Sequence, residues 1–456
     1  MKLKAIILAA GEGKRMKSRL PKVLHRVNGQ PMLEHVIEAA EGSNVSECIV
    51  VVGHGADTVR ESIPPHIKTV LQQEQLGTGH AVMMAYDHID EEGLVLVLYG
   101  DGPLITEATL NDLMNYHIEG KYGATVLTTE LENPHGYGRI LRNEDNELDR
   151  IVEEKDTSSE EKLIKEVNSG IYCFAAKALK EALPKLQNNN AQKEYYLTDV
   201  LSIIKELGQR SGIFKISDYE EIMAVNSREQ LAEVEEIMRR RINKRHMIKG
   251  VTLINPDHTY IGKGVIIGQD TIIYPGTIIT GKTTIGNDCI IGQNCKIEDS
   301  TLANNVTVEG STIISSSIDE YTSIGPYAYL RPGSQIGKHV KIGDFVEVKN
   351  SSIGDYSKAS HLAYIGDAEV GKHVNIGCGV VFVNYDGKNK NKTVVEDYGF
   401  IGSNANLVAP VIVRENGYVA SGSTITKEVP RGTLAVARSK QENKEGWVER
   451  KGLLKK

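Results

Sequence analysis

The chain has 456 residues, and 53 Lys plus Arg stand against 60 Asp plus Glu, which gives a formal net charge of −7. This length is typical of two or three domains of about 150 residues each. The acidic balance argues against a nucleic acid as partner.

The cysteines and the apolar segments indicate where such a chain works. The five cysteines include no C-x-x-C pair, which argues against a disulfide framework or a Cys-based zinc site and favours a reducing compartment. The apolar stretch near the N-terminus is too short for a signal peptide, and no run reaches the roughly 20 apolar residues of a membrane span. We therefore expect a cytoplasmic protein without membrane insertion.

The first 225 or so residues alternate between short apolar runs and segments with helical periodicity. The run that begins at Lys4 (Lys-Ala-Ile-Ile-Leu-Ala) is continuous, as is typical of a strand buried on both faces of a parallel sheet. The further strand candidates begin at Glu47, Gly93, Ala124 and Ser169, and the helix candidates are residues 31–40, 106–119 and 198–207. This alternation predicts a Rossmann-like α/β domain with a mostly parallel sheet over residues 1–227.

Residues 228–249 read as one charged helix. Acidic residues such as Glu229 and Glu233 come early, and basic residues such as Arg241 and Arg245 come late. This order complements the helix dipole. We interpret the segment as a solvated helix that connects the first domain to the remainder of the chain.

Beyond Gly250 the sequence becomes a repeat of six residues, with an aliphatic residue first and often Gly second. Its copies include Ile261-Gly-Lys-Gly-Val-Ile, Ile285-Gly-Asn-Asp-Cys-Ile and Ile342-Gly-Asp-Phe-Val-Glu. Three hexapeptides make one triangular coil, so Ile261, Ile279 and Ile297 are expected to stack in one interior ladder. The repeat resembles the hexapeptide-repeat family, which implies a left-handed parallel β-helix over residues 250–456, with a short tail after Pro430.

The repeat is interrupted between Gly379 and Phe400 by a polar insertion that contains Asn384 and Tyr385. Insertions in a solenoid lie outside the coil, and binding residues are concentrated in such loops. The insertion is therefore a candidate binding region.

The first motif that carries chemistry is Leu8-Ala-Ala-Gly-Glu-Gly-Lys-Arg-Met, directly after the first predicted strand. Backbone amides in such a glycine-rich turn can face phosphate oxygens. The motif is not the dinucleotide fingerprint, because residue 16 is Met, and not a Walker A loop, because Leu8 and Arg15 replace the required Gly and Ser/Thr. With Leu-Pro-Lys at residues 20–22, it resembles the signature of sugar-1-phosphate nucleotidyltransferases.

The strand that ends at Asp101 places a carboxylate where open α/β sheets bind ligands. An Asp there suits Mg²⁺, which prefers few carboxylates plus substrate phosphates. The resemblance implies Asn226 as the second metal contact, and Arg15 and Lys22 as catalytic cations that stabilise the triphosphate. The residues that it implies for UTP and the nucleotide-sugar product are Leu8, Ala9, Ala10, Gly11, Lys22, Gln72, Gly77, Thr78, Tyr99, Gly100, Asp101, Gly138, Glu153, Asn168 and Asn226.

The implied reaction is attack by a sugar-1-phosphate oxygen on the α-phosphorus of UTP, with release of pyrophosphate. The protein would position and neutralise the reactants and form no covalent intermediate. Mg²⁺ would be the cofactor.

A second candidate site surrounds His361, in Ser-His-Leu-Ala-Tyr, at a small break in the repeat. One coil returns about every eighteen residues, so Tyr364, Asn384 and Tyr385 are expected near it. The N-terminal motif, the repeats, His-Leu-Ala-Tyr and Asn-Tyr-Asp-Gly together resemble the family of bifunctional N-acetylglucosamine-1-phosphate uridylyltransferases and glucosamine-1-phosphate acetyltransferases. This resemblance covers nearly the whole chain.

It implies that His361 is the general base that frees the glucosamine amine to attack acetyl-CoA, a task that suits an imidazole. It assigns the amino-sugar phosphate to Arg331, Lys349, Tyr364 and Asn375. It assigns acetyl-CoA to Cys378, Asn384, Tyr385, Ser403, Ser421 and Arg438. Cys378 stands where many relatives have Ala, so we expect a backbone contact there rather than thiol chemistry.

The two reactions together would convert glucosamine-1-phosphate, acetyl-CoA and UTP, through N-acetylglucosamine-1-phosphate, into UDP-N-acetylglucosamine for the bacterial cell envelope. Hexapeptide acyltransferases commonly form trimers, which implies a homotrimer with active sites between subunits. Two alternatives compete with this interpretation. In the first alternative the chain is a nucleotidyltransferase whose β-helix is only regulatory; the presence of His361, Arg331 and Lys349 argues against it. In the second alternative the chain is a non-catalytic scaffold; the presence of Lys22 and Asp101 argues against that.

Overall fold

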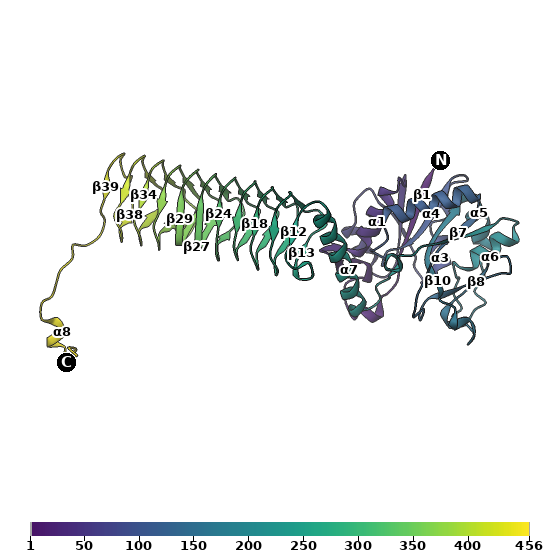
Figure 1. The fold of residues 1–456 in the computed structure, drawn as a ribbon. Coiled ribbons are helices and arrows are strands. Elements are labelled where there is room, and N and C mark those ends of the chain that lie inside the picture. Colours follow the sequence, from purple (N-terminus) through teal and green to yellow (C-terminus); the bar gives the residue numbers. More distant parts are fainter. Residues whose placement is uncertain (1, 456) are drawn as a thin grey trace. The chain divides into compact units, whose positions relative to one another are not determined.

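The computed structural model describes residues 2–455, and the chain divides into two compact units, Met1–Met238 and Arg239–Lys456. Each unit is shown in Figure 1. The division lies within helix α7 (Arg228–Ile248), which forms where a helix is predicted for residues 228–249. No helix among the described residues has both the length and the apolar character needed to cross a membrane.

Unit 1 is built on one mostly parallel sheet, which confirms the predicted fold class. Its strands, in spatial order, are β11 (Ser211–Lys215), β7 (Ala124–Glu130), β10 (Glu166–Ala175), β6 (Leu94–Tyr99), β1 (Leu3–Ala9), β4 (Glu47–Val52) and β5 (Lys68–Leu71). Strand β10 runs antiparallel to both neighbours and also pairs with the hairpin of β8 (Gly138–Arg142) and β9 (Leu148–Val152). The carboxyl ends of β1 and β6 therefore meet at one edge of the sheet.

Helices cover both faces of this sheet, and the alternation along β1 explains why. Ile7 belongs to one buried cluster and Ile6 to the other, because successive side chains of a strand point to opposite faces. The helices are α1 (Met32–Gly42), α2 (Ala56–Ser62), α3 (Thr78–Met83), α4 (Glu107–Gly120), α5 (Ala176–Ala182) and α6 (Asp199–Glu206). The shorter elements are β2 (Arg26–Val27), β3 (Gln30–Pro31), η1 (Lys14–Met16), η2 (Lys22–Leu24), η3 (Tyr86–His88), η4 (Glu154–Asp156), η5 (Glu161–Leu163), η6 (Leu183–Lys185) and η7 (Tyr219–Ile222).

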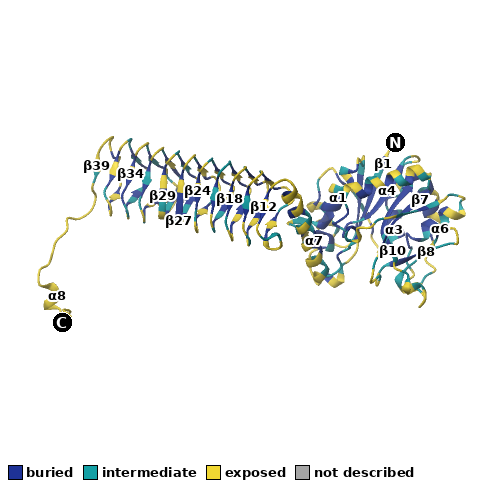
Figure 2. Cartoon of the chain, viewed as in Figure 1, coloured by how far each residue is buried: buried dark blue, intermediate teal, exposed yellow. Residues whose placement is uncertain are grey.

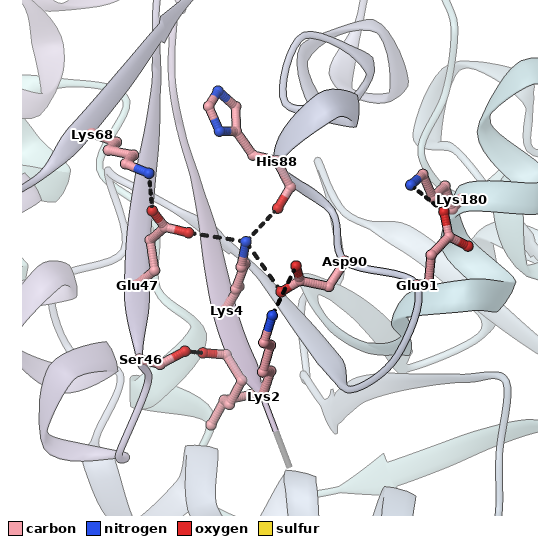
Figure 3. Close-up of polar contacts among 10 residues, drawn as sticks. Lys2, Lys4, Ser46, Glu47, Lys68, His88, Asp90, Glu91 and Lys180 are labelled. Carbon is pink, nitrogen blue, oxygen red and sulfur yellow. Dashed lines mark hydrogen bonds and ion pairs between the residues drawn. The ribbon is translucent and has the colours of Figure 1, made fainter.

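An ion-pair network fastens the amino ends of the central strands, at the sheet edge opposite those carboxyl ends (Figure 3). The ammonium group of Lys4 lies 3.0 Å from Glu47 Oε2 and 3.2 Å from Asp90 Oδ2. It also donates a hydrogen bond of 2.7 Å to the carbonyl oxygen of His88. Because Lys4 is on β1, Glu47 on β4 and Asp90 just before β6, the network joins three neighbouring segments.

Unit 2 is a left-handed parallel β-helix, as the repeat implies, and its coils are stacked one after another (Figure 1). The strand pairings give each coil three faces, which follow one another along the chain. The first face contains β12 (Thr252–Leu253), β15 (Ile272–Ile273), β18 (Ile290–Ile291), β21 (Thr307–Val308), β24 (Ser323–Ile324), β31 (Asn375–Ile376), β34 (Phe400–Ile401), β37 (Tyr418–Val419) and β39 (Leu434–Ala435). The second face contains β13 (Tyr260–Ile261), β16 (Ile278–Thr280), β19 (Lys296–Glu298), β22 (Thr312–Ile314), β25 (Tyr329–Leu330), β32 (Val381–Val383), β35 (Asn406–Val408) and β38 (Thr424–Ile425). The third face contains β14 (Ile266–Ile267), β17 (Thr284–Ile285), β20 (Thr301–Leu302), β23 (Ser317–Ile318), β26 (Gln335–Ile336), β28 (Ser352–Ile353), β30 (Ala368–Val370), β33 (Thr393–Val395) and β36 (Val411–Val413).

Two long strands join the first face to the second. They are β27 (Lys341–Lys349) and β29 (Lys358–Gly366), which pair in parallel along their length. We call the turn between the first and second faces the first corner, the turn between the second and third faces the second corner, and the remaining turn the third corner.

The interior of unit 2 is a stack of aliphatic side chains. Ile261, Ile279 and Ile297 are in register in successive coils and are fully buried, so the predicted interior ladder is confirmed. Figure 2 shows the alternation of buried and exposed residues along each coil. After the last coil, residues 436–455 are exposed and contain the short helix α8 (Trp447–Arg450).

Candidate functional site

A cavity of about 450 Å³ opens in unit 1 at the carboxyl ends of β1 and β6. Residues 8–11, which follow or end β1, line one wall, and Tyr99 and Asp101 at the end of β6 line another. This is the position where open α/β sheets bind ligands. The glycine-rich motif therefore lies at the mouth of a ligand-sized hollow.

Three polar side chains from distant parts of the chain converge on this cavity. The ammonium group of Lys22 pairs with the carboxylate of Asp101 and donates to Asn226 Oδ1 at 3.1 Å. The backbone N–H of Val225 donates to the carbonyl oxygen of Asp101 at 2.9 Å, which ties the two segments together. All three side chains are among the predicted site residues.

The chemistry of this cluster suits a divalent cation. The Oδ1 atom of Asp101 is buried and has no hydrogen-bond partner among the described residues. A carboxylate and an amide oxygen beside this cavity are ligands that Mg²⁺ accepts, with substrate oxygens and water completing its shell. The residues present therefore fit the metal that the sequence motif implies.

Gln72, Gly77 and Thr78 form another wall of the cavity. The amide nitrogen of Gln72 donates to the carbonyl oxygen of Gly77 at 3.2 Å, which fixes the turn before α3. Gly77 has φ +111°, and a Cβ there would lie 2.6 Å from the carbonyl oxygen of Tyr195. Only glycine therefore fits this turn.

Gly138, Glu153 and Asn168 meet at the opposite side of the cavity, because β8 pairs with both β9 and β10. Burial raises the pKa of the Glu153 carboxyl, and its Oε1 accepts a hydrogen bond from the Thr198 hydroxyl at 3.2 Å. Asn168 is held by a hydrogen bond of 2.8 Å from its amide to the hydroxyl of Tyr172. This wall offers fixed polar groups of the kind that recognise a sugar.

Two predicted residues do not line the cavity. The backbone N–H of Gly100 donates to the carbonyl oxygen of Leu8 at 2.9 Å, so Gly100 lies behind the wall and joins β6 to β1. Arg15 is exposed on η1 and lies outside the lining. The other residues predicted for the nucleotide and its sugar all line it.

The lining also includes side chains that sequence reasoning misses, among them Gln75, Tyr137, Glu194 and Glu221. Glu221 is buried and accepts hydrogen bonds from the backbone and the hydroxyl of Thr106, at 3.1 and 3.0 Å. Tyr137 directly precedes the predicted Gly138, and Gln75 lies between the predicted Gln72 and Gly77, which is a usable signal. Glu194 and Glu221 belong to no recognised motif, and only the fold brings them to the cavity.

In unit 2, His361 lies at the first corner on β29. Its Nδ1 atom is 2.7 Å from Oδ1 of Asp344, which is the residue in register on β27 one coil earlier. Asp344 is not among the predicted site residues. The signal that could reveal it is its place in the hexapeptide Ile-Gly-Asp-Phe-Val-Glu, one coil before His361.

The second corner carries a separate polar cluster. Arg331 donates to Glu347 Oε1 at 2.8 Å, and Lys349 Nζ lies 3.8 Å from Asp367 Oδ2. The amide of Asn384 donates to the same Asp367 oxygen at 2.5 Å. Predicted residues Arg331, Lys349 and Asn384 are thus gathered at one corner.

Two contacts extend this second-corner cluster. The hydroxyl of Tyr364 lies 3.4 Å from the amide nitrogen of Asn384, so the structure brings these two predicted residues together. Lys390, in the insertion, lies against Lys349, whose ammonium group lowers the pKa of Lys390. Two adjacent ammonium groups make a local positive charge that suits a phosphate. Sequence reasoning misses Lys390 because the insertion contains several lysines with no periodic position.

The remaining predicted residues lie elsewhere on the β-helix. Cys378 and Ser403 occupy the first corner in the coils after His361. Ser421 lies at the same corner in the next coil, so close that a Cβ on Gly402 would be 2.5 Å from its backbone nitrogen. Asn375 is on the first face. Tyr385 is exposed in the insertion and donates to the carbonyl oxygen of Gly387 at 2.6 Å. Arg438 is exposed in the tail.

Comparison with known proteins finds a matching family model within each unit and close relatives over the whole chain. A family model described as the MobA-like NTP transferase domain matches residues 5–199, and one described as the bacterial transferase hexapeptide (six repeats) matches residues 315–350. The bifunctional protein GlmU of Alkaliphilus metalliredigens is 68% identical over 456 residues, and that of Alkaliphilus oremlandii is 70% identical over 456 residues, with 100% of each chain covered in both cases. The bifunctional protein GlmU of Clostridioides difficile is 59% identical over 451 residues, which are 99% of this chain and 98% of the relative.

Proposed function

The chain belongs to the family of the bifunctional protein GlmU, and we propose that each of its two units carries one of the active sites. The protein is a bifunctional transferase that makes UDP-N-acetylglucosamine. Unit 2 transfers an acetyl group from acetyl-CoA to glucosamine-1-phosphate. Unit 1 then transfers a uridylyl group from UTP to N-acetylglucosamine-1-phosphate and releases pyrophosphate.

The observation that carries the uridylyl site is the convergence of Lys22, Asp101 and Asn226 on the cavity of unit 1. Asp101 and Asn226 would hold Mg²⁺, which when bound neutralises triphosphate charge. Lys22 faces the same phosphates and stabilises the charge that develops on the departing pyrophosphate. Gln72 and Thr78 bind the uracil side, and Glu153 and Asn168 bind the amino sugar, so that the sugar-phosphate oxygen is held against the α-phosphorus.

In unit 2, Arg331 and Lys349 bind the phosphate of glucosamine-1-phosphate, with Tyr364 and Asn384 beside them. His361 takes a proton from the sugar ammonium, and the free amine attacks the thioester carbonyl of acetyl-CoA. A C–N bond forms, the C–S bond breaks, and CoA leaves with its sulfur protonated. Acetyl-CoA lies along the first corner past Cys378, Ser403 and Ser421, and Arg438 meets its phosphates.

This assignment implies that the acetyltransferase works as a homotrimer. Asn375 is on the first face, whereas Arg331 and Lys349 are at the second corner, so one chain's coil holds them apart. A second copy can bring its first face against the second corner of its neighbour. The hexapeptide-repeat fold, which is common in oligomers, supports this arrangement.

The two sites can be separated in one experiment on the purified full chain. It follows free CoA with glucosamine-1-phosphate and acetyl-CoA, and pyrophosphate with N-acetylglucosamine-1-phosphate, UTP and Mg²⁺. His361→Ala is expected to lose CoA release by about 10²–10⁴-fold, because general base catalysis contributes that much, and to keep pyrophosphate release. Asp101→Ala is expected to show the reverse pattern.

Other outcomes would contradict the proposal. A wild-type chain that releases pyrophosphate but never CoA would mean that the β-helix has only a regulatory role. A chain that releases neither product would favour a non-catalytic scaffold.

A further inference from the structure

The contact between His361 and Asp344 has no role in the function proposed above. The two residues are in register on β29 and β27, and the imidazole Nδ1 lies 2.7 Å from the carboxylate Oδ1. The two strands come close together at this corner: a Cβ on Gly343 would overlap the carbonyl oxygen of Ser360. The backbone therefore fixes the two side chains next to each other.

We propose that Asp344 is a positioning residue for His361 in acetyl transfer. It accepts the Nδ1–H hydrogen bond, which fixes the tautomer and leaves the lone pair of Nε2 free to take the proton of the sugar ammonium. The carboxylate also stabilises the imidazolium that forms at that moment. This inference rests on the proposed role of His361 as the general base.

Two other carboxylates of this region have hydrogen-bond partners other than His361. Glu347, on the same strand as Asp344, accepts from Arg331 at 2.8 Å. Asp367 accepts from the amides of Asn350 and Asn384, at 2.7 and 2.5 Å. Both therefore act at the second corner, and Asp344 is the carboxylate that contacts the imidazole.

The charges around the pair are consistent with this role. The pKa of Asp344 lies below its usual value, mainly because its carboxylate accepts the hydrogen bond from His361. The positive charge of Lys341, on the same strand, also lowers this pKa. Asp344 is therefore ionised at neutral pH. Cys378 occupies the equivalent corner position in the coil after His361, and it carries no carboxylate that could compete for the imidazole.

Asp344→Asn tests the role, because asparagine keeps the size of the side chain and removes its charge. We expect kcat for CoA release to fall by about tenfold to a hundredfold, a part of the 10²–10⁴-fold that a general base contributes. KM for glucosamine-1-phosphate is expected to stay within about twofold. Removing a negative charge beside the imidazole disfavours its protonated form, so the acid limb of kcat/KM should move to lower pH. Asp344→Glu should restore part of the lost rate.

The controls make the test specific. Asp355→Asn changes a carboxylate of the same β-helix that pairs with Lys372 at 2.8 Å, away from the first corner, and should leave CoA release unchanged. Pyrophosphate release by every variant reports on folding of the rest of the chain. A further variant, Glu347→Gln, should raise KM for glucosamine-1-phosphate and leave the acid limb in place.

Three results would overturn the proposal. One is an Asp344→Asn variant that keeps the wild-type kcat and the same acid limb while His361→Ala is inactive. His361 would then act as the general base without any help from Asp344. Another is a fall in rate that appears only in KM. The third is a His361→Ala variant that still releases CoA at the wild-type rate, which would remove both the base and the reason to position it.

Discussion

At the scale of single residues, one aromatic ring helps to shape the cavity of unit 1. Tyr99, at the end of β6, forms part of the cavity wall, and its removal from water raises the pKa of its hydroxyl. Gly170 has φ +79°, and a Cβ there would overlap the ring of Tyr99. The missing side chain at residue 170 therefore decides where the ring can lie.

Gly170→Ala is expected to impair uridylyl transfer and to leave acetyl transfer intact, because the added methyl group pushes Tyr99 out of place. A non-glycine residue in such a strained backbone conformation destabilises the fold by about 1–3 kcal/mol, so the thermal unfolding midpoint of unit 1 should also fall. Kinetic assays of both activities and thermal unfolding measure the two effects. Gly208→Ala is the matched control, since Gly208 has φ +82° but open space around it. Equal loss of uridylyl activity in both variants would show that strain, and not the clash with Tyr99, is responsible.

At the scale of elements, the third corner of the β-helix carries a ladder of stacked rings. In chain order the rings belong to Tyr321, His339, Tyr356, His373 and Tyr398, with centroids 4.7–5.0 Å apart. All five residues have φ between 55° and 61°, a conformation that is unfavourable for side chains other than Gly, Asn and Asp. At each of these positions, stacking of the ring on its neighbours in adjacent coils therefore offsets part of the cost of the strained backbone.

Replacing Tyr356, in the middle of this ladder, separates the two effects. Tyr356→Ala loses two ring contacts, each worth about 0.5–1.5 kcal/mol, and keeps the strained backbone. Tyr356→Gly loses the same contacts but relieves the strain, so we expect it to be the more stable of the two variants, with both below wild type. Chemical denaturation followed by circular dichroism measures the order. A Tyr356→Ala variant as stable as wild type would show that the ladder contributes nothing.

At the scale of the whole molecule, the β-helix distributes its polar clusters over different corners and faces of each coil. His361 is at the first corner, the Arg331 and Lys349 cluster is at the second, and Asn375 is on the first face. A straight stack of coils cannot fold these positions toward one another. In the trimer that we propose, a neighbouring copy would bring its first face to the second corner.

Mixing two inactive variants tests this arrangement directly. Arg331→Ala and Asn375→Ala are each expected to lose most CoA release on their own. If Arg331 and Asn375 of one site come from different chains, mixed oligomers contain some sites with both residues intact, and activity returns on mixing. The mass of the oligomer, measured by light scattering, should be three times that of one chain. A trimer without restored activity would mean that each chain supplies both residues to its own site.

The sequence alone determines those features of this protein whose residues lie close together along the chain or recur at a fixed period. The hexapeptide repeat predicts the β-helix and the burial of Ile261, Ile279 and Ile297, because its period records the geometry of one coil. The motif around Leu8 and the carboxylate of Asp101 predict the cavity, because each lies at the end of a strand recognisable from its own residues.

Only the tertiary structure decides the contacts between segments that carry no shared pattern. The pairing of Asp344 with His361 depends on coils that advance by seventeen residues here and by other steps elsewhere, so the register cannot be counted from an ideal period of eighteen. Glu221 reaches the cavity from the short helix η7, and Lys390 reaches the second corner from the insertion. Arg15, inside the clearest motif, lies outside the cavity. Local patterns determine which elements form, whereas packing between elements decides which side chains meet.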